Sequence, residues 1–339
     1  MSSPVKPIAA PFFEDLRVGE VAASAPALTL TDGHAALHQA ILGDRLRLPL
    51  DAGLCAEVVG SSLPVAHPGL VWDVSIGQST VVTQRVLANL FYRGLVLHRA
   101  PLIGDTLATS VETVALRQNK GRLGRPATGL ALLRVRTFDQ EKRPVLDFHR
   151  CAMLPLRDQR GRTGHADDLA AVAATATELG AGPLAASVAG WRLDSFRRLV
   201  AGEHFADVAA GARWEVEGDD VVSAAPELAR LTLNVATAHR DRYASGREGR
   251  LVYGGHTIGI AAAQLSRALP NLVTIVGWHA CDHLAPVLEG DTLHSEVELE
   301  RAEPLAGGGG LVHLLVRTRA RREGASADVL HWRLVGVMA

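Results

Sequence analysis

Two long apolar segments that begin at glycines, each followed by strand-like segments, dominate the hydrophobic pattern of the chain. The first runs from Gly69 to about Leu90 and the second from Gly255 to about Leu269. Apolar runs of this length favour buried helices over strands. Apolar residues then alternate with polar ones at 132–137, 145–154, 311–319 and 329–338, which is typical of antiparallel strands. The pattern predicts an α+β fold in which a curved antiparallel sheet wraps a long helix in each half.

A shorter helix is expected ahead of each long one. Thr31 with Asp32 is an N-cap signal for a helix that continues through Ile41, and Ser223 with Pro226 gives a similar signal in the second half. Leu228, Leu231 and Leu233 then indicate a helix end, followed by an irregular polar segment that leads to the second glycine-led helix.

The chain contains an internal repeat. The motif that begins at Phe13 recurs at Phe205, an offset of 192 residues, and the Gly-Asp-Thr-Leu motif at Gly104 recurs at Gly290, an offset of 186. Two further matches lie in the same order, Leu87-Ala-Asn89-Leu90 with Leu269-Pro-Asn271-Leu272 and Arg136-Thr137 with Arg317-Thr318.

The repeat predicts an N-terminal domain over 1–156 and a C-terminal domain over 191–339, joined by a linker over 157–190. Within the linker, Asp167-Asp168 is expected to cap a helix that runs through Glu178 and ends at Gly180.

Composition narrows the class of protein. The net charge is −1 and the pI is about 6.9, so the chain has no basic signature of a nucleic-acid partner. No uncharged apolar run of about 18 residues predicts a membrane span. The three cysteines, Cys55, Cys151 and Cys281, are odd in number and scattered, which favours a reduced, cytoplasmic protein over a disulfide framework.

Several short segments resemble a known family when they are taken in order. They are FFEDLRVGE (12–20), AHPGL (66–70), LANLFYRG (87–94), GDTL (104–107) and VLDFHR (145–150). Their order resembles the MaoC family of (R)-specific enoyl-CoA hydratases and dehydratases, and is most similar to its two-domain mesaconyl-CoA hydratase branch. The resemblance implies a double hotdog fold, in which two hotdog domains pair within one chain.

The resemblance also implies an Asp and a His that handle water, and each half retains only one of them. In the first half Asp44 follows Gly43, but Pro49 stands where the family has His. In the second half His239 is present, but Asn234 stands where the family has Asp. The resemblance therefore implies one working site, in the second half, while the first half holds the acyl chain or supports the fold.

We expect His239 to act as general acid/base, Asn234 to position water through its amide, and the N–H of Gly255 to hold the thioester carbonyl, with Gly69 as its first-half counterpart. Each has a structural alternative: a buried or loop histidine, an asparagine that caps a helix end, and glycines that permit close packing. Lys120 and Arg122, with Arg125, are either contacts for coenzyme A phosphates or a solvated hairpin tip.

No metal site or separate cofactor is expected, coenzyme A being part of the substrate. His279, Cys281 and His283 would share one face of a strand, but neighbours two apart lie about 7 Å from one another, too far to surround one tetrahedral ion.

These observations favour an acyl-CoA hydratase or dehydratase that acts on a 2-enoyl or branched acyl thioester. A non-catalytic acyl-CoA or fatty-acyl binding protein is the alternative, favoured by the missing Asp, and a hotdog thioesterase is a third. The partner is an acyl-CoA or acyl-carrier thioester, and the chain is expected to be a monomer, with an internal pseudo-dimer, or a homodimer.

Overall fold

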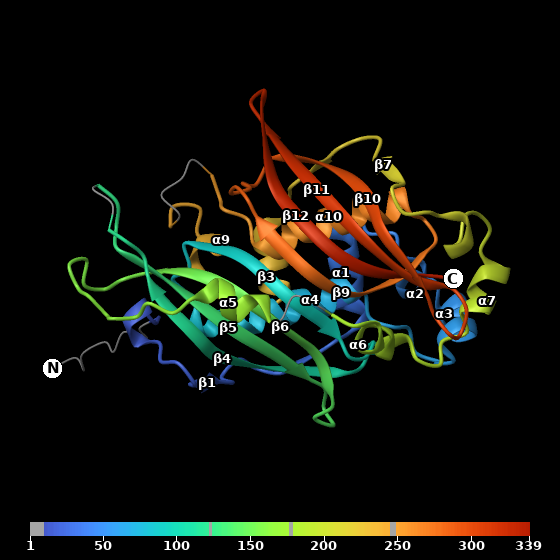
Figure 1. Ribbon diagram of the computed structural model, residues 1–339, viewed down its shortest axis with the longest axis horizontal. Coiled ribbons are helices and arrows are strands. Elements are labelled where there is room, and N and C mark those ends of the chain that lie inside the picture. Colours follow the sequence, from blue (N-terminus) through green and yellow to red (C-terminus); the bar gives the residue numbers. More distant parts are fainter. Residues whose placement is uncertain (1–9, 122–123, 176–178, 245–248) are drawn as a thin grey trace.

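The computed structural model describes residues 10–121, 124–175, 179–244 and 249–339, and the same order of elements occurs twice along them (Figure 1). The first half contains η1 Phe13–Asp15, β1 Val21–Ala22, β2 Leu28–Thr29, α1 Asp32–Leu42, α2 Arg47–Leu50, α3 Ala52–Val59, α4 Pro68–Gln78, η2 Ser79–Val82, β3 Ala88–Leu97, β4 Thr106–Gln118, β5 Thr128–Phe138 and β6 Pro144–Pro155. The second half contains η4 Phe205–Asp207, β7 Arg213–Glu215, β8 Asp220–Val221, α8 Ala225–Leu231, α9 Thr237–Arg240, α10 Gly254–Ala268, β9 Leu272–His283, β10 Thr292–Pro304, β11 Gly310–Arg322 and β12 Ala325–Met338.

One 12-stranded antiparallel sheet runs through both halves, in the order β1-β4-β5-β6-β3-β9-β12-β11-β10-β7. The halves join where β3 pairs with β9, with Tyr92 opposite Cys281 and Arg93 opposite Ala280. Figure 1 shows these two strands side by side at the centre, between the blue-to-green and orange-to-red halves. The predicted double hotdog, with its two domains paired within one chain, is confirmed.

The two long helices, α4 and α10, are enclosed by this sheet and contact each other. Every residue of α4 is buried, including the polar Asp73, Ser75 and Gln78, which explains why apolar residues on all sides make up most of its sequence. Trp72 of α4 packs edge-on against Trp278 and Trp332 of the second half, with ring centroids 4.9 and 6.1 Å away. Such pairs contribute about 0.5–1.5 kcal/mol each beyond area burial, so one aromatic core stabilises both halves.

Several predicted boundaries are correct and several are wrong. The helix capped by Thr31 is present as α1, with the Thr31 side chain accepting a hydrogen bond from the His34 N–H. The first long helix, however, ends at Gln78 rather than near Leu90, because residues 88–97 extend as β3 to join the halves. Ala224, not Ser223, is the N-cap of α8.

The repeat is also more regular than the sequence comparison indicates. By their pairing with β6 and β12, Tyr92 and Trp278 occupy equivalent places, as do Asn89 and Ile275. The offset in these strands is therefore 186, and the match of Asn89 with Asn271 is wrong. A bulge between Asn89 and Phe91 in β3 and one between Ile275 and Gly277 in β9 fall at this same offset.

The segment between the halves is partly helical, with α5 Leu169–Ala174, α6 Ala181–Ala185, η3 Ala186–Val188 and α7 Leu193–Leu199. Asp168 caps α5 as expected, its carboxylate accepting from Ala170 and Ala171. Gly180 precedes α6 instead of ending a helix, and Glu178 lies outside the described residues. The domain boundaries at 156 and 191 stay a prediction.

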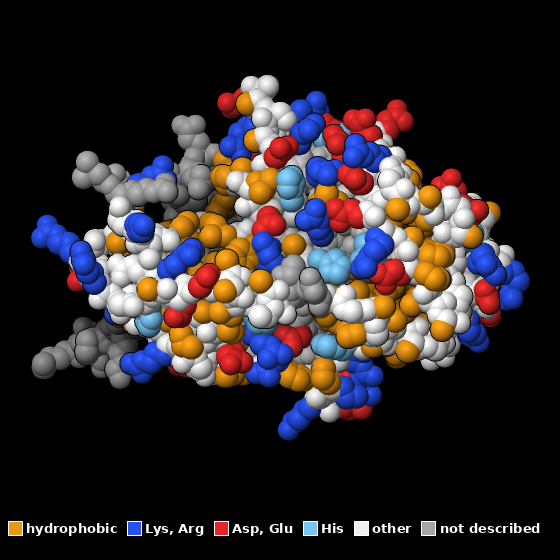
Figure 2. Space-filling model, in the orientation of Figure 1, with side chains coloured by type: hydrophobic (Ala, Val, Ile, Leu, Met, Phe, Trp, Pro, Cys, Tyr) orange, Lys and Arg blue, Asp and Glu red, His pale blue; other side chains and the backbone are white. Residues whose placement is uncertain are grey.

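Charges of both signs are mixed on one face of the molecule. Figure 2 shows Lys and Arg interspersed with Asp and Glu over the visible face of the sheet. Cross-strand ion pairs account for part of this pattern, including Arg317 with Glu298 and Arg333 with Glu300. Among the described residues, no helix combines the length and apolar character needed to cross a bilayer.

Candidate active site

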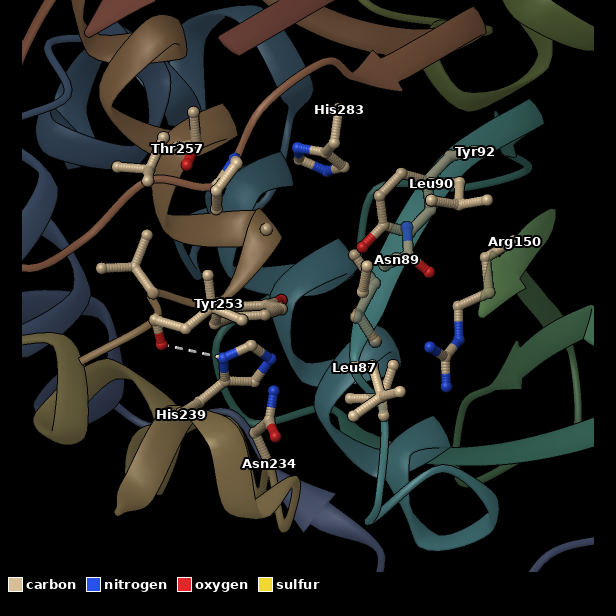
Figure 3. Close-up of a pocket in the computed structure, with 18 of the residues that line it drawn as sticks. Leu87, Asn89, Leu90, Tyr92, Arg150, Asn234, His239, Tyr253, Thr257 and His283 are labelled. Atoms are coloured by element: carbon tan, nitrogen blue, oxygen red, sulfur yellow. Dashed lines mark hydrogen bonds between the residues drawn. The ribbon is translucent and has the colours of Figure 1, made fainter. Parts of the chain in front are cut away.

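A cavity of about 180 Å³ lies between the start of α10, helix α9 and strand β3. Figure 3 shows its second-half wall, with Asn234, His239 and Tyr253, facing a first-half wall with Leu87, Asn89 and Arg150. Strands β3 and β6 of the first half therefore complete a site whose predicted catalytic groups belong to the second half.

His239 presents an unprotonated nitrogen to this cavity. Its Nδ1 lies 3.1 Å from the Leu251 carbonyl oxygen, which can only accept a hydrogen bond, so Nδ1 carries the proton and Nε2 has the lone pair. The pKa of His239 is lowered to about 4, mainly by burial; the hydrogen bond to Leu251 opposes this shift, and the nearby Arg150 cation adds to it. The imidazole is therefore neutral at pH 7 and able to accept a proton.

Asn234 lies next to His239 and has a free donor. The side chain is buried, its Oδ1 accepts from the Ala236 N–H at 2.9 Å, and its buried Nδ2 has no partner among the described residues. Figure 3 shows this amide directed toward the His239 ring. In the first half Asp44 Oδ1 accepts from the Leu46 N–H in the same way, so the predicted equivalence of Asp44 and Asn234 agrees with the geometry.

The start of α10 supplies unpaired backbone donors beside these side chains. The helix begins at Gly254, which lines the cavity, and in the described part of the chain the N–H groups of Gly254 and Gly255 have no acceptor. Unpaired N–H groups at a helix start stabilise negative charge. The two halves differ here, because the first-half counterpart, Gly69, donates its N–H to the His67 ring at 2.9 Å.

Gly255 also has a packing role that the sequence does not reveal. A Cβ on Gly255 would collide with Asp73 Oδ1 and with the Tyr253 ring. The Tyr253 hydroxyl donates to Asp73 Oδ1 at 2.8 Å, and Asp73 Oδ2 lies 3.1 Å from His38 Nε2. A first-half carboxylate on α4 thus fixes a tyrosine in the wall of the cavity, and glycine at 255 leaves room for that bond.

The equivalent place in the first half is nearly closed. Its cavity has a volume of only about 10 Å³, and its lining includes Pro49, where the second half has His239, together with Ser187 and Trp191 from the segment between the halves. Asp44 is paired with His67 at 3.0 Å. Burial would raise the pKa of Asp44, but His67 and the Leu46 N–H hold it below its ordinary value.

The other candidates are separated by the structure. The prediction that His279, Cys281 and His283 share one face of a strand is wrong for His279, because β9 has a bulge between Trp278 and Ala280, while the regular register beyond it leaves Cys281 and His283 on one face. His283 lines the cavity, His279 lies 2.9 Å from His313, and Cys281 is in the core. The described residues contain no group of three side chains suited to a metal ion.

The two basic residues remain predictions. Lys120 is exposed on the turn between β4 and β5 and is not part of the cavity lining. Arg122 lies outside the described residues.

Residues that the sequence analysis did not assign lie on the first-half wall and around Tyr253. Asn89, Tyr92 and Arg150 all belong to the LANLFYRG and VLDFHR segments, so the family resemblance marked these segments without giving the residues a role. Asp73 and Tyr253 could not be identified from the sequence, because neither belongs to a motif of residues at a fixed spacing. Only the packing of α4 against the start of α10 brings them together.

No model of a protein family matches the chain, but characterised relatives do. The chain is 30% identical over 313 residues to mesaconyl-CoA hydratase from Cereibacter sphaeroides, covering 89% of this chain and 87% of that one. It is 28% identical over 323 residues to β-methylmalyl-CoA dehydratase from Chloroflexus aurantiacus, covering 92% and 88% respectively.

Two solved structures have the same architecture over nearly the whole chain. A conserved hypothetical protein from Mycobacterium tuberculosis, described as essential for bacterial survival during infection and as having a double hotdog fold, superposes with a TM-score of 0.90 at 50% identity, covering 97% of this chain and 99% of that one. A putative MaoC domain dehydratase from Chloroflexus aurantiacus superposes with a TM-score of 0.81 at 23% identity, covering 99% of both chains.

Proposed function

Because the chain belongs to the MaoC-like family of CoA-thioester hydratases and dehydratases, we propose that it adds water reversibly across the double bond of a 2-enoyl-CoA thioester. The observation that carries the proposal is the cavity lined both by His239, whose Nε2 has a lone pair, and by Gly254, whose unpaired N–H begins α10. A base and an oxyanion donor are the two groups that this reaction requires.

In the hydration direction, His239 Nε2 takes one proton from water as the water oxygen bonds to Cβ of the substrate. The electron pair of the Cα–Cβ double bond moves toward the thioester carbonyl, whose oxygen becomes an enolate held by the N–H groups of Gly254 and Gly255. The protonated His239 then delivers its proton to Cα, which restores the carbonyl. The Asn234 NH₂ group donates to the water oxygen and orients it.

The test is to follow loss of the conjugated enoyl absorbance with a panel of enoyl-CoA thioesters, for the wild type and for His239→Ala. We expect turnover by the wild type and at least a 100-fold loss in the variant, the usual scale for a general acid/base. His331→Ala is the matched control, because His331 lies on β12 outside the cavity lining, and it should retain full activity.

Two other outcomes separate the competing functions. Binding of acyl-CoA without turnover of any substrate would establish a binding protein, which the loss of the family carboxylate at Asn234 favours. Release of free CoA thiol, detected with a thiol reagent, would establish a thioesterase.

We further propose a monomer in the cytoplasm. The β3–β9 pairing already joins two hotdog halves within one chain, and Cys55, Cys151 and Cys281 are all free and buried, which fits a reducing compartment.

A further inference from the structure

His283 is a histidine of the cavity wall to which the proposed mechanism gives no role. It is the last residue of β9 and lines the cavity. Although part of the residue is exposed, its Nε2 is buried and has no hydrogen-bond partner among the described residues. A buried polar atom without a partner costs free energy, so an unused hydrogen bond inside a ligand cavity indicates a place for a ligand atom.

The unpartnered nitrogen lies at the start of α10. A Cβ on Gly254 would come within 2.7 Å of His283 Nε2 and 3.0 Å of its Cε1, so the edge of the imidazole faces the first residue of the helix. The N–H groups of Gly254 and Gly255, which the described residues leave unpaired, belong to the same turn. The Tyr92 ring packs edge-on against the imidazole, with centroids 5.8 Å apart and planes at 70°, and holds it in this position.

The first half provides an internal comparison for this histidine. By their pairing with β12 and β6, His283 and Leu97 occupy equivalent places, and Leu97 lines the nearly closed cavity. The fold thus accepts leucine where His283 stands. By their pairing with β5 and β11, Arg150 and Leu334 are equivalent in the same way, with the arginine beside the open cavity. Both polar side chains therefore belong to the open cavity, and the fold itself does not require them.

The two histidines of the cavity lie at different places in it. Figure 3 shows His283 and His239 at opposite ends of the cavity, with Tyr253, which directly precedes α10, between them. His239 lies beside Asn234, the residue proposed to hold water. His283 lies instead at the helix start, where negative charge is stabilised. Its position therefore suits contact with the thioester carbonyl rather than with water.

The imidazole of His283 is neutral at pH 7. Burial lowers its pKa to about 4; the Asp282 carboxylate opposes this shift, and His239 adds to it. The positive end of the helix dipole also disfavours a further positive charge at this place. A neutral imidazole beside a helix N-terminus can donate a hydrogen bond to a carbonyl oxygen without giving up its proton, so it can polarise the carbonyl as an electrophile.

We propose that His283 is a catalytic residue whose Nε2–H donates to the thioester carbonyl, as a third donor beside the N–H groups of Gly254 and Gly255. When the enolate forms, its oxygen gains negative charge and this hydrogen bond strengthens. No covalent bond forms or breaks at His283, whose proton stays on Nε2, and His239 remains the group that moves a proton. The inference rests on the proposed hydratase function and adds a residue to it.

Kinetics of His283 variants test this role. His283→Leu copies the residue of the first half, so it should fold, and we expect kcat to fall about 100-fold with a smaller change in KM. His283→Gln offers an amide N–H in place of the ring N–H and should stay within about tenfold of the wild type. His331→Leu is the matched control, because His331 lies outside the cavity lining, and it should retain full activity.

Two kinetic results would overturn the proposal. A loss in His283→Gln as large as in His283→Leu would mean that His283 moves a proton, because an amide replaces a hydrogen bond but not a proton-transfer group. An unchanged kcat in His283→Leu, at an unchanged melting temperature, would leave His283 as a packing residue. If the leucine variant does not fold, His283→Asn takes its place, since its shorter amide does not reach the position of Nε2.

Infrared spectroscopy separates this inference from the reaction itself. The ligand is butyryl-CoA with an isotopic label at the carbonyl carbon, a saturated thioester that cannot be hydrated. Its carbonyl stretching frequency falls as hydrogen bonds to the oxygen strengthen, so we expect a lower frequency in complexes of the wild type and His283→Gln than in that of His283→Leu. This pattern without turnover of any enoyl substrate would support the donor while contradicting the hydratase. Turnover with the same frequency in all three complexes would contradict the donor alone.

Discussion

In the proposed mechanism, the amide at position 234 leaves His239 as the only base. An aspartate there would place a second base beside the imidazole, whereas Asn234 has an amide whose buried Nδ2 has no partner within the described ranges of the chain. Burial and the nearby cation lower the pKa of His239 to about 4 and keep it neutral over the physiological range, so in the proposed mechanism it is the base and Asn234 holds the water.

Asn234→Asp is expected to maintain activity or raise it up to about tenfold. The new carboxylate can still accept from the Ala236 N–H, and its charge favours protonated His239, so the acid limb of the pH–rate profile should move above pH 4. Profiles of kcat/KM for the wild type and the variant measure both effects. A loss beyond tenfold would show that the amide donor itself is needed. Asn119→Asp controls for the added charge, because Asn119 does not line the cavity and its partner, the Thr128 hydroxyl, can donate to the new carboxylate.

At the scale of secondary structure, the start of α10 is the decisive element. Its N-cap, Tyr253, makes no side-chain capping bond, whereas the first-half N-cap, His67, caps its own helix and occupies the donor. The same helix therefore begins with free donors in one half and a satisfied donor in the other.

Gly254→Ala should lower kcat/KM at least tenfold while the melting temperature changes little. A Cβ at this position would lie 2.7 Å from His283 Nε2 and 3.5 Å from the Tyr92 hydroxyl, so it narrows the cavity from the side of the oxyanion donors. Gly307→Ala is the control, because a Cβ there meets nothing within 4 Å. Unchanged kinetics for Gly254→Ala would mean that substrate does not approach this turn.

The sequence predicts the helices and strands more completely than it predicts the residues of the candidate active site. Alternating residues in β5, β6, β11 and β12 and the Thr31 cap are local signals, and they predict local structure correctly. The end of α4 is not local, because residues 88–97 become a strand only through pairing with β9. The hydrogen bond between Asp73 and Tyr253 joins residues about 180 positions apart, and Arg150 lines the same cavity as His239, about 90 positions later in the chain. No rule of sequence spacing relates residues so far apart.

For the molecule as a whole, the two cavities of about 180 and 10 Å³ imply one ligand per chain. Calorimetric titration with butyryl-CoA or succinyl-CoA should give a stoichiometry near one. A value near two would mean that the space lined by Pro49 and Trp191 opens in solution.

Acid should destabilise the fold well before its carboxylates titrate. Burial lowers the pKa values of His239, His256 and His283 to about 4, while an unfolded histidine has a pKa of about 6.5. Between these values the unfolded chain binds more protons, so stability falls as pH decreases from about 6.5 to 4, by up to about 1.4 kcal/mol per pH unit for each histidine. Urea unfolding at pH 7, 6 and 5 measures this slope, and His256→Leu should reduce it; a flat profile would contradict the three low pKa values.

The pairing of β3 with β9 inside one polypeptide also concerns how such a protein can change over time. In a symmetric dimer of identical chains, every substitution appears at both sites, so an arginine suited to one cavity would be buried in the other as well. When the two halves are fused into one chain, a substitution in one half is not repeated in the other. The two halves differ at these places, with Arg150 in one and Leu334 in the other, and with His239 in one and Pro49 in the other, and their cavities differ in volume, as separate specialisation allows.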